Sequence, residues 1–177
     1  MEKLFIRKIT SDDKQLFFDM SEEFYNSSAV LHPINASCHA AAFEEMMRSE
    51  DYIRGFILCD GENAVGYAIL NIMFCREVGG KTVWIEELYI RDAYRGKGYG
   101  SEFFKWLKEN EPAARFRLEA EPSNFKAIKL YRTAKWYWIP TNNYAFMPES
   151  FGKRMKSSSV AHFLIRFCRN NVVELSI

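Results

Sequence analysis

The sequence predicts a mixed α/β fold in a single domain, and three observations support this prediction. The length of 177 residues is typical of one domain. Two strand-like stretches, 53–59 and 64–73, flank an Asp60-Gly61 turn, as in an antiparallel hairpin. From residue 83 onward, strand and helix patterns alternate, and a hairpin followed by such an alternation is typical of a mixed sheet.

The elements before the hairpin follow from local patterns. Residues 4–9 are typical of a short strand. Ser11-Asp12-Asp13 supplies the side chains that begin helices, and apolar residues follow at helical spacing. A second helix is expected at about 37–48, after a turn-rich stretch at 24–33.

The elements after the hairpin are separated by clear breaks. Gly79-Gly80 precedes the next strand, and Glu111-Pro112 and Pro122 interrupt the pattern further on. The expected elements are a strand at 83–90, a glycine-rich turn at 95–100, a helix at 101–110, a strand at 116–120 and a helix at 124–133.

Charge and composition exclude several classes of protein. The chain carries 24 basic and 23 acidic residues, a net charge of +1, whereas a broad nucleic-acid-binding surface normally needs a large basic excess. No apolar run approaches the ~20 residues that cross a bilayer, and the N-terminus lacks the apolar core of a secretion signal. We therefore expect a cytoplasmic protein with no nucleic-acid or membrane partner.

The cysteines and histidines show no disulfide framework and no metal-ligand spacing. The four cysteines form no C-x-x-C pair, and the three histidines lie at no ligand spacing from them. Scattered cysteines of this kind are typical of free thiols in a reducing compartment, so the sequence predicts no metal site. The cysteines are Cys38, Cys59, Cys75 and Cys168.

The glycine-rich turn carries the most information about function. Gly96, Gly98 and Gly100 lie between a strand and a helix, where backbone N–H groups can converge at the positive end of the helix dipole. Such a turn is a seat for an anion, most often phosphate, and Arg95 and Lys97 add positive charge beside it. The alternative is a purely structural turn.

Two common phosphate-binding motifs do not fit this turn. A P-loop requires Gly-Lys followed by Ser or Thr, but Lys97 is followed by Gly98. A dinucleotide fingerprint requires G-x-G-x-x-G, whereas the glycines here are spaced G-x-G-x-G, although Glu119 lies near the distance of the ribose-binding acid. The preceding hairpin is also not the parallel start of a nucleotide-binding fold.

Two motifs together resemble the Gcn5-related N-acetyltransferase (GNAT) superfamily. Arg95-x-x-Gly98-x-Gly100 follows a strand that ends Leu88-Tyr89-Ile90, and it resembles the family's acetyl-coenzyme A pyrophosphate loop. Asn124-x-x-Ala127-x-x-Leu130-Tyr131 resembles the family's later motif helix. The resemblance covers roughly residues 4–147. It implies a twisted, mostly antiparallel mixed sheet with helices on both faces.

The resemblance also implies which residues bind the coenzyme. The backbone of three strand residues should pair with the pantetheine arm like an added strand, and the loop should hold the pyrophosphate. The expected coenzyme-binding residues are Leu88, Tyr89, Ile90, Arg95, Gly96, Lys97, Gly98, Tyr99, Gly100, Ser101, Asn124, Ala127 and Tyr131.

Acetyl transfer to an amine needs an acid and a path for a proton. In the family, the motif tyrosine points at the coenzyme sulfur, which makes Tyr131 the expected acid; the alternative is a core tyrosine. Glu86, with Glu87 beside it, and Glu119 are the candidate bases, and Glu86 is slightly preferred. Only one of two adjacent strand residues can point into the site. Each glutamate could instead be a strand-end salt-bridge partner.

The resemblance implies an N-acetyltransferase that transfers the acetyl group of acetyl-coenzyme A directly to a primary amine of a small molecule or peptide. The alternative is a catalytically silent module that binds or senses acyl-coenzyme A. Four carboxylates on two neighbouring strands favour a cationic acceptor, unless they are simply solvated. These are Glu86, Glu87, Glu119 and Glu121.

The C-terminal part departs from the family. Where the family has Gly-Phe after the motif tyrosine, this chain has Lys135-Trp136-Tyr137-Trp138, so the acceptor pocket should be built differently there. We assign 1–150 to the acetyltransferase domain and 151–177 to a C-terminal extension. An amphipathic stripe in the extension favours packing or a homodimer contact over catalysis; it consists of Val160, Phe163, Leu164 and Phe167.

Overall fold

The computed structural model describes residues 4–27, 30, 34–120, 124–134, 137–139 and 143–146. It divides the chain into two compact units. The first comprises Met1–Met73 and Val83–Pro112, and the second comprises Phe74–Thr82 and Ala113–Ile177. Glu121, Pro122 and the predicted C-terminal extension lie outside the described residues.

The first unit contains a four-stranded run of sheet with three helices. Its elements are β1 (Phe5–Lys8), α1 (Lys14–Tyr25), α2 (Ala36–Arg48), β2 (Ile53–Asp60), β3 (Asn63–Cys75), β4 (Gly80–Ile90) and α3 (Tyr99–Asn110). The strands are ordered β1-β2-β3-β4. The pairs β1–β2 and β2–β3 are antiparallel, which confirms the predicted hairpin. The tip joining β3 to β4 belongs to the second unit.

The residues that cap the helices determine where α2 and α3 begin. Asn35 accepts a hydrogen bond from the Ser37 amide and begins α2. The predicted first helix starts later than expected, because Ser11–Asp13 forms a 3₁₀ turn before α1. Helix α3 starts two residues earlier than expected, at Tyr99, because Gly98 occupies the capping position.

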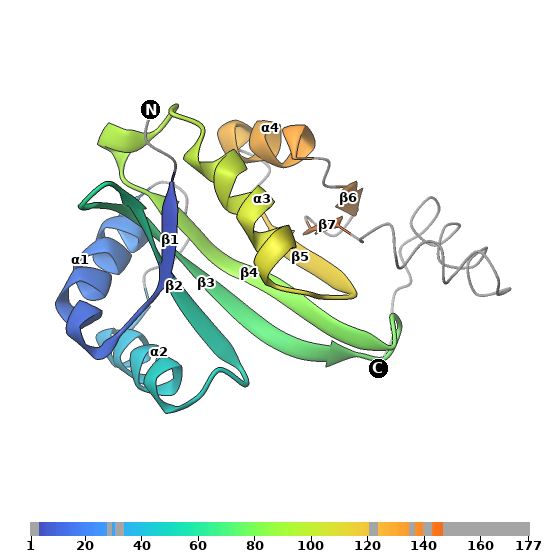
Figure 1. The fold of residues 1–177 in the computed structure, drawn as a ribbon, viewed down its shortest axis with the longest axis horizontal. Helices are drawn as coiled ribbons and strands as arrows, with labels where there is room; N and C mark the ends of the chain where they lie inside the picture. The colour runs from blue at the N-terminus through green and yellow to red at the C-terminus, as the bar shows by residue number, and fades with distance from the viewer. Residues whose placement is uncertain are drawn as a thin grey trace, which may run out of the picture. The chain divides into compact units, whose positions relative to one another are not determined.

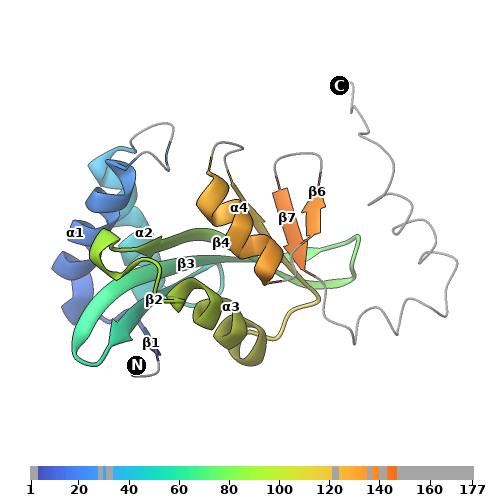
Figure 2. The same cartoon turned by 90° about the horizontal axis from the view of Figure 1, so that it is seen from above.

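Helices cover both faces of the sheet in the first unit. On one face, Ile57 and Tyr67 are fully buried in a cluster with residues of α1 and α2, among them Phe17 and Phe43. The preceding residue of β2, Phe56, points the other way and packs on Trp106 of α3, with ring centroids 5.0 Å apart. Figures 1 and 2 show α1 and α2 on one side of β2 and β3 and α3 on the other. The predicted fold class is confirmed.

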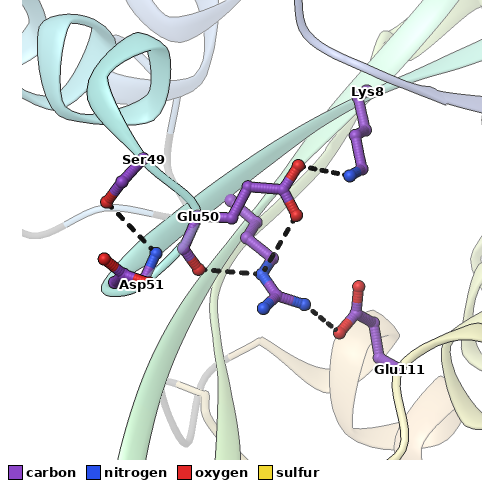
Figure 3. Close-up of polar contacts among 6 residues, drawn as sticks. Lys8, Ser49, Glu50, Asp51 and Glu111 are labelled. Carbon is purple, nitrogen blue, oxygen red and sulfur yellow. Dashed lines mark hydrogen bonds and ion pairs between the residues drawn. The ribbon is translucent and has the colours of Figure 1, made fainter.

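A network of charges joins distant parts of the first unit (Figure 3). Glu50, in the segment before β2, accepts a hydrogen bond from the ammonium group of Lys8 in β1. Arg54 of β2 donates to the Glu50 backbone carbonyl and, at 2.7 Å, to Glu111 at the end of α3. The Glu111 side chain is only 7% exposed, so this ion pair is largely shielded from water.

The second unit is built on three short strands and one helix. Its elements are β5 (Arg115–Glu119), α4 (Phe125–Thr133), β6 (Tyr137–Ile139) and β7 (Asn143–Phe146). Strand β7 lies between β5 and β6 and is antiparallel to both. None of the helices in the described ranges is long and apolar enough to span a bilayer.

Candidate functional site

The loop between β4 and α3 holds its glycines in a backbone conformation that other residues rarely adopt. Gly96 has φ +80° and Gly98 has φ +90°. The Gly98 carbonyl accepts from the amides of Ser101 and Glu102, at 2.9 and 3.1 Å, and so begins α3. The first amides of a helix have no carbonyl partner within the helix and point toward its N-terminal end. A Cβ built on either glycine meets nothing within 4 Å, so there is room for a ligand to approach this backbone.

The side chains of the loop hold the loop itself. The Arg95 guanidinium donates from Nε to the Ile90 carbonyl at 2.8 Å and forms an ion pair with Asp92 at 2.5 Å. The Lys97 ammonium lies 4.9 Å from the centre of the Tyr94 ring. Both cations therefore brace the turn.

The side chain of Tyr99 anchors the start of α3 to the end of β2. Its hydroxyl donates to Asp60 at the end of β2, and its side chain is buried. The hydrogen bond to Asp60 raises the pKa of Tyr99 to about 12. The Tyr99 phenol is thus a neutral anchor that ties the helix start to the β2–β3 turn.

Strand β4 turns its two adjacent glutamates to opposite faces. Glu86 is exposed and accepts from the Asn71 side-chain amide at 3.0 Å. Glu87 is half-buried on the face covered by α1, where one carboxylate oxygen accepts from Tyr25 at 2.7 Å and the other from Tyr67 at 2.5 Å. Alternation along the strand predicts such a split but not which glutamate lies inward.

Burial shifts the pKa values of Glu87 and of the two tyrosines that donate to it, Tyr25 and Tyr67. It raises the pKa of Glu87, and the hydrogen bonds from Tyr67 and Tyr25 oppose that rise. Burial also raises the pKa of Tyr25 and of Tyr67, and the nearby Glu87 charge raises both further. The two hydroxyls therefore remain donors, and the carboxylate is the acceptor between them.

The end of β4 alternates a buried tyrosine with half-buried residues. Tyr89 is buried, and its hydroxyl donates to Glu23 of α1 at 3.0 Å. Burial, and then the hydrogen bond to Glu23, raises the pKa of Tyr89 to about 12. Leu88 and Ile90 are half-buried and point to the opposite face, by strand alternation.

Gly66 of β3 brings the two strands close together at the end of β4. A Cβ on Gly66 would lie 2.1 Å from the Tyr89 carbonyl oxygen. Only glycine therefore fits at this position in β3. No expectation from the sequence included this constraint, and the only signal for it was a glycine inside a strand pattern.

In the second unit, the start of α4 accounts for the spacing of the motif at 124–131. The Asn124 side chain accepts from the Ala127 amide at 3.1 Å, so Asn124 caps α4. Ala127 and Tyr131 are both half-buried and lie four residues apart, on the same face of α4. Glu119 is exposed at the last residue of β5. The predicted acidic residue Glu121 is not among the described residues.

Comparison with known proteins identifies the family. The acetyltransferase (GNAT) family matches residues 15–135, about two thirds of the chain. The chain belongs to the GNAT family. Both motifs of the sequence analysis, the loop at 95–100 and the helix motif at 124–131, lie inside the matched region.

Relatives of this GNAT protein include enzymes that act on amines. Thialysine N-epsilon-acetyltransferase of Sus scrofa is 32% identical over 76 residues, which cover 41% of this chain and 44% of the relative. The enzyme of the same name from Mus musculus shows the same identity over 75 residues. The chain thus matches less than half the length of these relatives.

Solved structures share the fold at low sequence identity. Aminoglycoside N(6′)-acetyltransferase from Legionella pneumophila has a TM-score of 0.67 and 18% identity, covering 87% of this chain and 98% of the other. Spermidine N-acetyltransferase from Vibrio cholerae, solved with CoA and spermine, has a TM-score of 0.63 and 12% identity, covering 84% and 98%. These likenesses establish the GNAT fold for the chain.

Proposed function

We propose that this GNAT protein is an N-acetyltransferase that transfers the acetyl group of acetyl-coenzyme A directly to a primary amine of a small molecule or peptide. The observation that carries the proposal is the loop at the start of α3, where Gly96 and Gly98 adopt positive φ and leave the approach to the backbone open. A seat of converging amides suits a pyrophosphate. Family membership supports the reaction class.

The residues present fit the coenzyme. The amides from Gly96 to Gly100 would hold the pyrophosphate next to Ser101, whose own amide donates to the Gly98 carbonyl. The backbone of Leu88, Tyr89 and Ile90 would pair with the pantetheine arm. When bound, the coenzyme supplies the acetyl group as a reactive thioester. Asn124 and Ala127 contribute through the cap that fixes the first turn of α4. No group of three potential metal ligands occurs among the residues that the structure describes, and no metal enters the proposal.

The transfer needs groups that manage protons. A lysine-like amine has a pKa near 10.4 and must lose a proton before it can attack, so a carboxylate base or a water chain assists. Glu86 and Glu119 remain the candidate bases. Both are exposed, which suits proton exchange with solvent. Tyr131 is the candidate acid for the departing sulfur. The Glu86→Gln and Glu119→Gln variants distinguish the bases, because only loss of the true base removes the acidic limb of the pH–rate profile.

The acceptor is a cationic amine in this proposal. The exposed carboxylates of Glu86 and Glu119 would raise the local concentration of cations. Relatives named for thialysine and spermidine act on amines of this kind. A rise in salt should therefore lower kcat/KM, because screening acts over about 8 Å at 0.15 M. A cytoplasmic location completes the proposal and agrees with the free thiols of Cys38, Cys59 and Cys75.

One pair of variants tests the loop. Gly98→Val introduces a branched side chain where φ is +90°, and it should weaken coenzyme A binding at least ~10-fold in isothermal titration. Gly79→Val is the matched control, since Gly79 also has positive φ with open space but lies in the β3–β4 turn. Equal affinity in both folded variants would contradict the proposed seat.

Turnover separates the enzyme from the silent module. Release of coenzyme A thiol is measured with acetyl-coenzyme A and a panel of polyamines, lysine analogues and peptide amines. Turnover with a cationic amine supports the enzyme. Tight binding of acetyl-coenzyme A without turnover on any amine would favour the silent module.

A further inference from the structure

Glu23 of α1 holds two side chains at the end of β4. One of its carboxylate oxygens accepts from the Tyr89 hydroxyl at 3.0 Å and from Nε of Arg91 at 3.1 Å. The other oxygen accepts from Nη2 of Arg91, also at 3.1 Å, so the guanidinium is bound through two hydrogen bonds. Tyr89 and Arg91 lie two residues apart, so both side chains point to the face that α1 covers.

The main chain of the same two residues is directed toward β3. The Arg91 amide donates to the Val65 carbonyl at 2.9 Å, and the Arg91 guanidinium donates to the Ala64 carbonyl at 3.3 Å. The Tyr89 carbonyl oxygen lies against Gly66, where a Cβ would be only 2.1 Å away. Tyr89 and Arg91 are therefore fixed twice, by contacts with β3 and by side-chain contacts with α1.

The residue between them, Ile90, turns its backbone the other way. The carbonyl and amide groups of successive strand residues alternate in direction, so those of Ile90 point away from β3, and those of Leu88 do the same. On that side the Ile90 carbonyl accepts from Nε of Arg95 at 2.8 Å. Leu88 and Ile90 belong to the backbone segment proposed to pair with the pantetheine arm. The direction of that edge is set by the residues fixed on either side of Ile90.

The ion pair between Glu23 and Arg91 is better suited to orienting a strand than to stabilising the fold. The Arg91 side chain is 29% exposed and that of Glu23 is 43% exposed, and ion pairs this accessible to water contribute little to folding stability. A guanidinium held through two of its nitrogens is nevertheless fixed in direction as well as in distance. The contact therefore limits the orientations that the end of β4 can adopt.

We propose that Glu23 is a positioning residue for coenzyme binding, which acts through Tyr89 and Arg91 to set the backbone edge of Leu88 and Ile90 for the pantetheine arm of acetyl-coenzyme A. Because the coenzyme comes from the proposed function, the role of Glu23 rests on that function. Glu23 lies on α1, outside both the loop at 95–100 and the helix motif at 124–131.

Two ligands separate pairing with the pantetheine arm from binding of the pyrophosphate. Acetyl-coenzyme A carries both parts, whereas adenosine 3′-phosphate 5′-diphosphate carries the pyrophosphate without the pantetheine arm. In isothermal titration, Glu23→Ala should bind acetyl-coenzyme A about tenfold more weakly than the wild type, because the strand edge is no longer held in place. Its affinity for the nucleotide should be unchanged. A merely structural role would leave both affinities unchanged or weaken both together.

Further variants identify the partners through which Glu23 acts. Glu23→Gln keeps an oxygen that accepts from Tyr89 but removes the ion pair, so affinity for acetyl-coenzyme A should fall only about threefold. Glu22→Ala removes the same charge from the neighbouring exposed residue of α1 and is the matched control, with unchanged affinity. In a chain that carries Tyr89→Phe and Arg91→Met, adding Glu23→Ala should have no further effect, because both partners are gone.

Steady-state kinetics with a cationic amine complete the test. Glu23→Ala should raise the KM for acetyl-coenzyme A and leave the KM for the amine unchanged. Equal affinity of folded Glu23→Ala and wild type for acetyl-coenzyme A, or a parallel loss of affinity for both ligands, would overturn the role of Glu23 and leave the transferase standing. Binding without turnover in the wild type would overturn the transferase alone. Absence of coenzyme binding in the folded wild type would overturn both.

Discussion

Two regions of the first unit hold buried or half-buried carboxylates in different ways. Before α1 and at the end of α3, Asp13 and Glu111 are matched by Arg7 and Arg54. On β4, Glu87 is matched only by hydroxyls within the described residues. The difference teaches that a shielded carboxylate can be held either by an arginine, as an ion pair that joins elements, or by hydroxyls that leave its charge uncompensated by a cation.

Breaking an internal pair should have the largest effect on stability. Arg54→Ala leaves Glu111 buried without its arginine and should lower the free energy of unfolding by about 3 kcal/mol. Urea unfolding measures this, and coenzyme A affinity should stay the same. Adding Glu111→Gln should recover part of the loss. No loss in Arg54→Ala would show that the pair in Figure 3 does not support the fold.

A substitution at Tyr131, the candidate acid, tests the proposed reaction rather than the ion pairs that support the fold. Tyr131→Phe retains the ring, so folding should be unaffected, while kcat should fall ~10²-fold if the hydroxyl delivers a proton to sulfur. Steady-state kinetics with a cationic amine, together with thermal unfolding, measures both. A lower melting temperature with unchanged kcat would instead assign Tyr131 to packing.

Lowering the pH should weaken the ion pair between Asp13 and Arg7. The Arg7 guanidinium holds the pKa of Asp13 at about 2, below its usual 3.8. The resulting stability of about 2 kcal/mol is present above pH 4 and lost as pH falls toward 2. Unfolding followed between pH 5 and 2 should show this loss in the wild type. It should be smaller in Asp13→Asn, which lacks the titrating group.

Glu87→Gln should have the smallest effect on stability and sharpens the comparison most. Because burial raises the pKa of Glu87, its ionised form opposes folding above that pKa. Glutamine removes this charge, so at pH 8 stability should rise slightly, by less than about 1 kcal/mol. Urea unfolding at pH 8 and pH 5 checks the sign. A clear loss of stability would place Glu87 with the structural pairs.

Much of the fold could be predicted because periodicity and turn residues are local. The hairpin, the glycine turn and both motif helices occur where the sequence predicts them, with ends shifted by a few residues. The shift at α3 has a physical cause. Gly98 caps the helix with a positive φ, and helix propensity alone does not predict a glycine in that position. The fit of Gly66 under Tyr89 depends on contact between strands and left no comparable signal.

The site was less predictable, because side-chain roles depend on what packs nearby. The sequence identifies Arg95 as a charge for an anion, but the structure gives its guanidinium to Ile90 and Asp92. It places Asn124 in a binding motif, and the structure shows a helix cap. The hydrogen bonds from Tyr25 and Tyr67 to Glu87 join three elements, and no spacing rule reveals them.

The bracing of the loop by Arg95 has a kinetic consequence. A loop tied to its own strand loses its conformational freedom during folding, so little further ordering is required when a ligand arrives. Coenzyme association should then follow a single exponential whose rate rises linearly with concentration. Loosening the brace should introduce a slower phase that no longer depends on concentration.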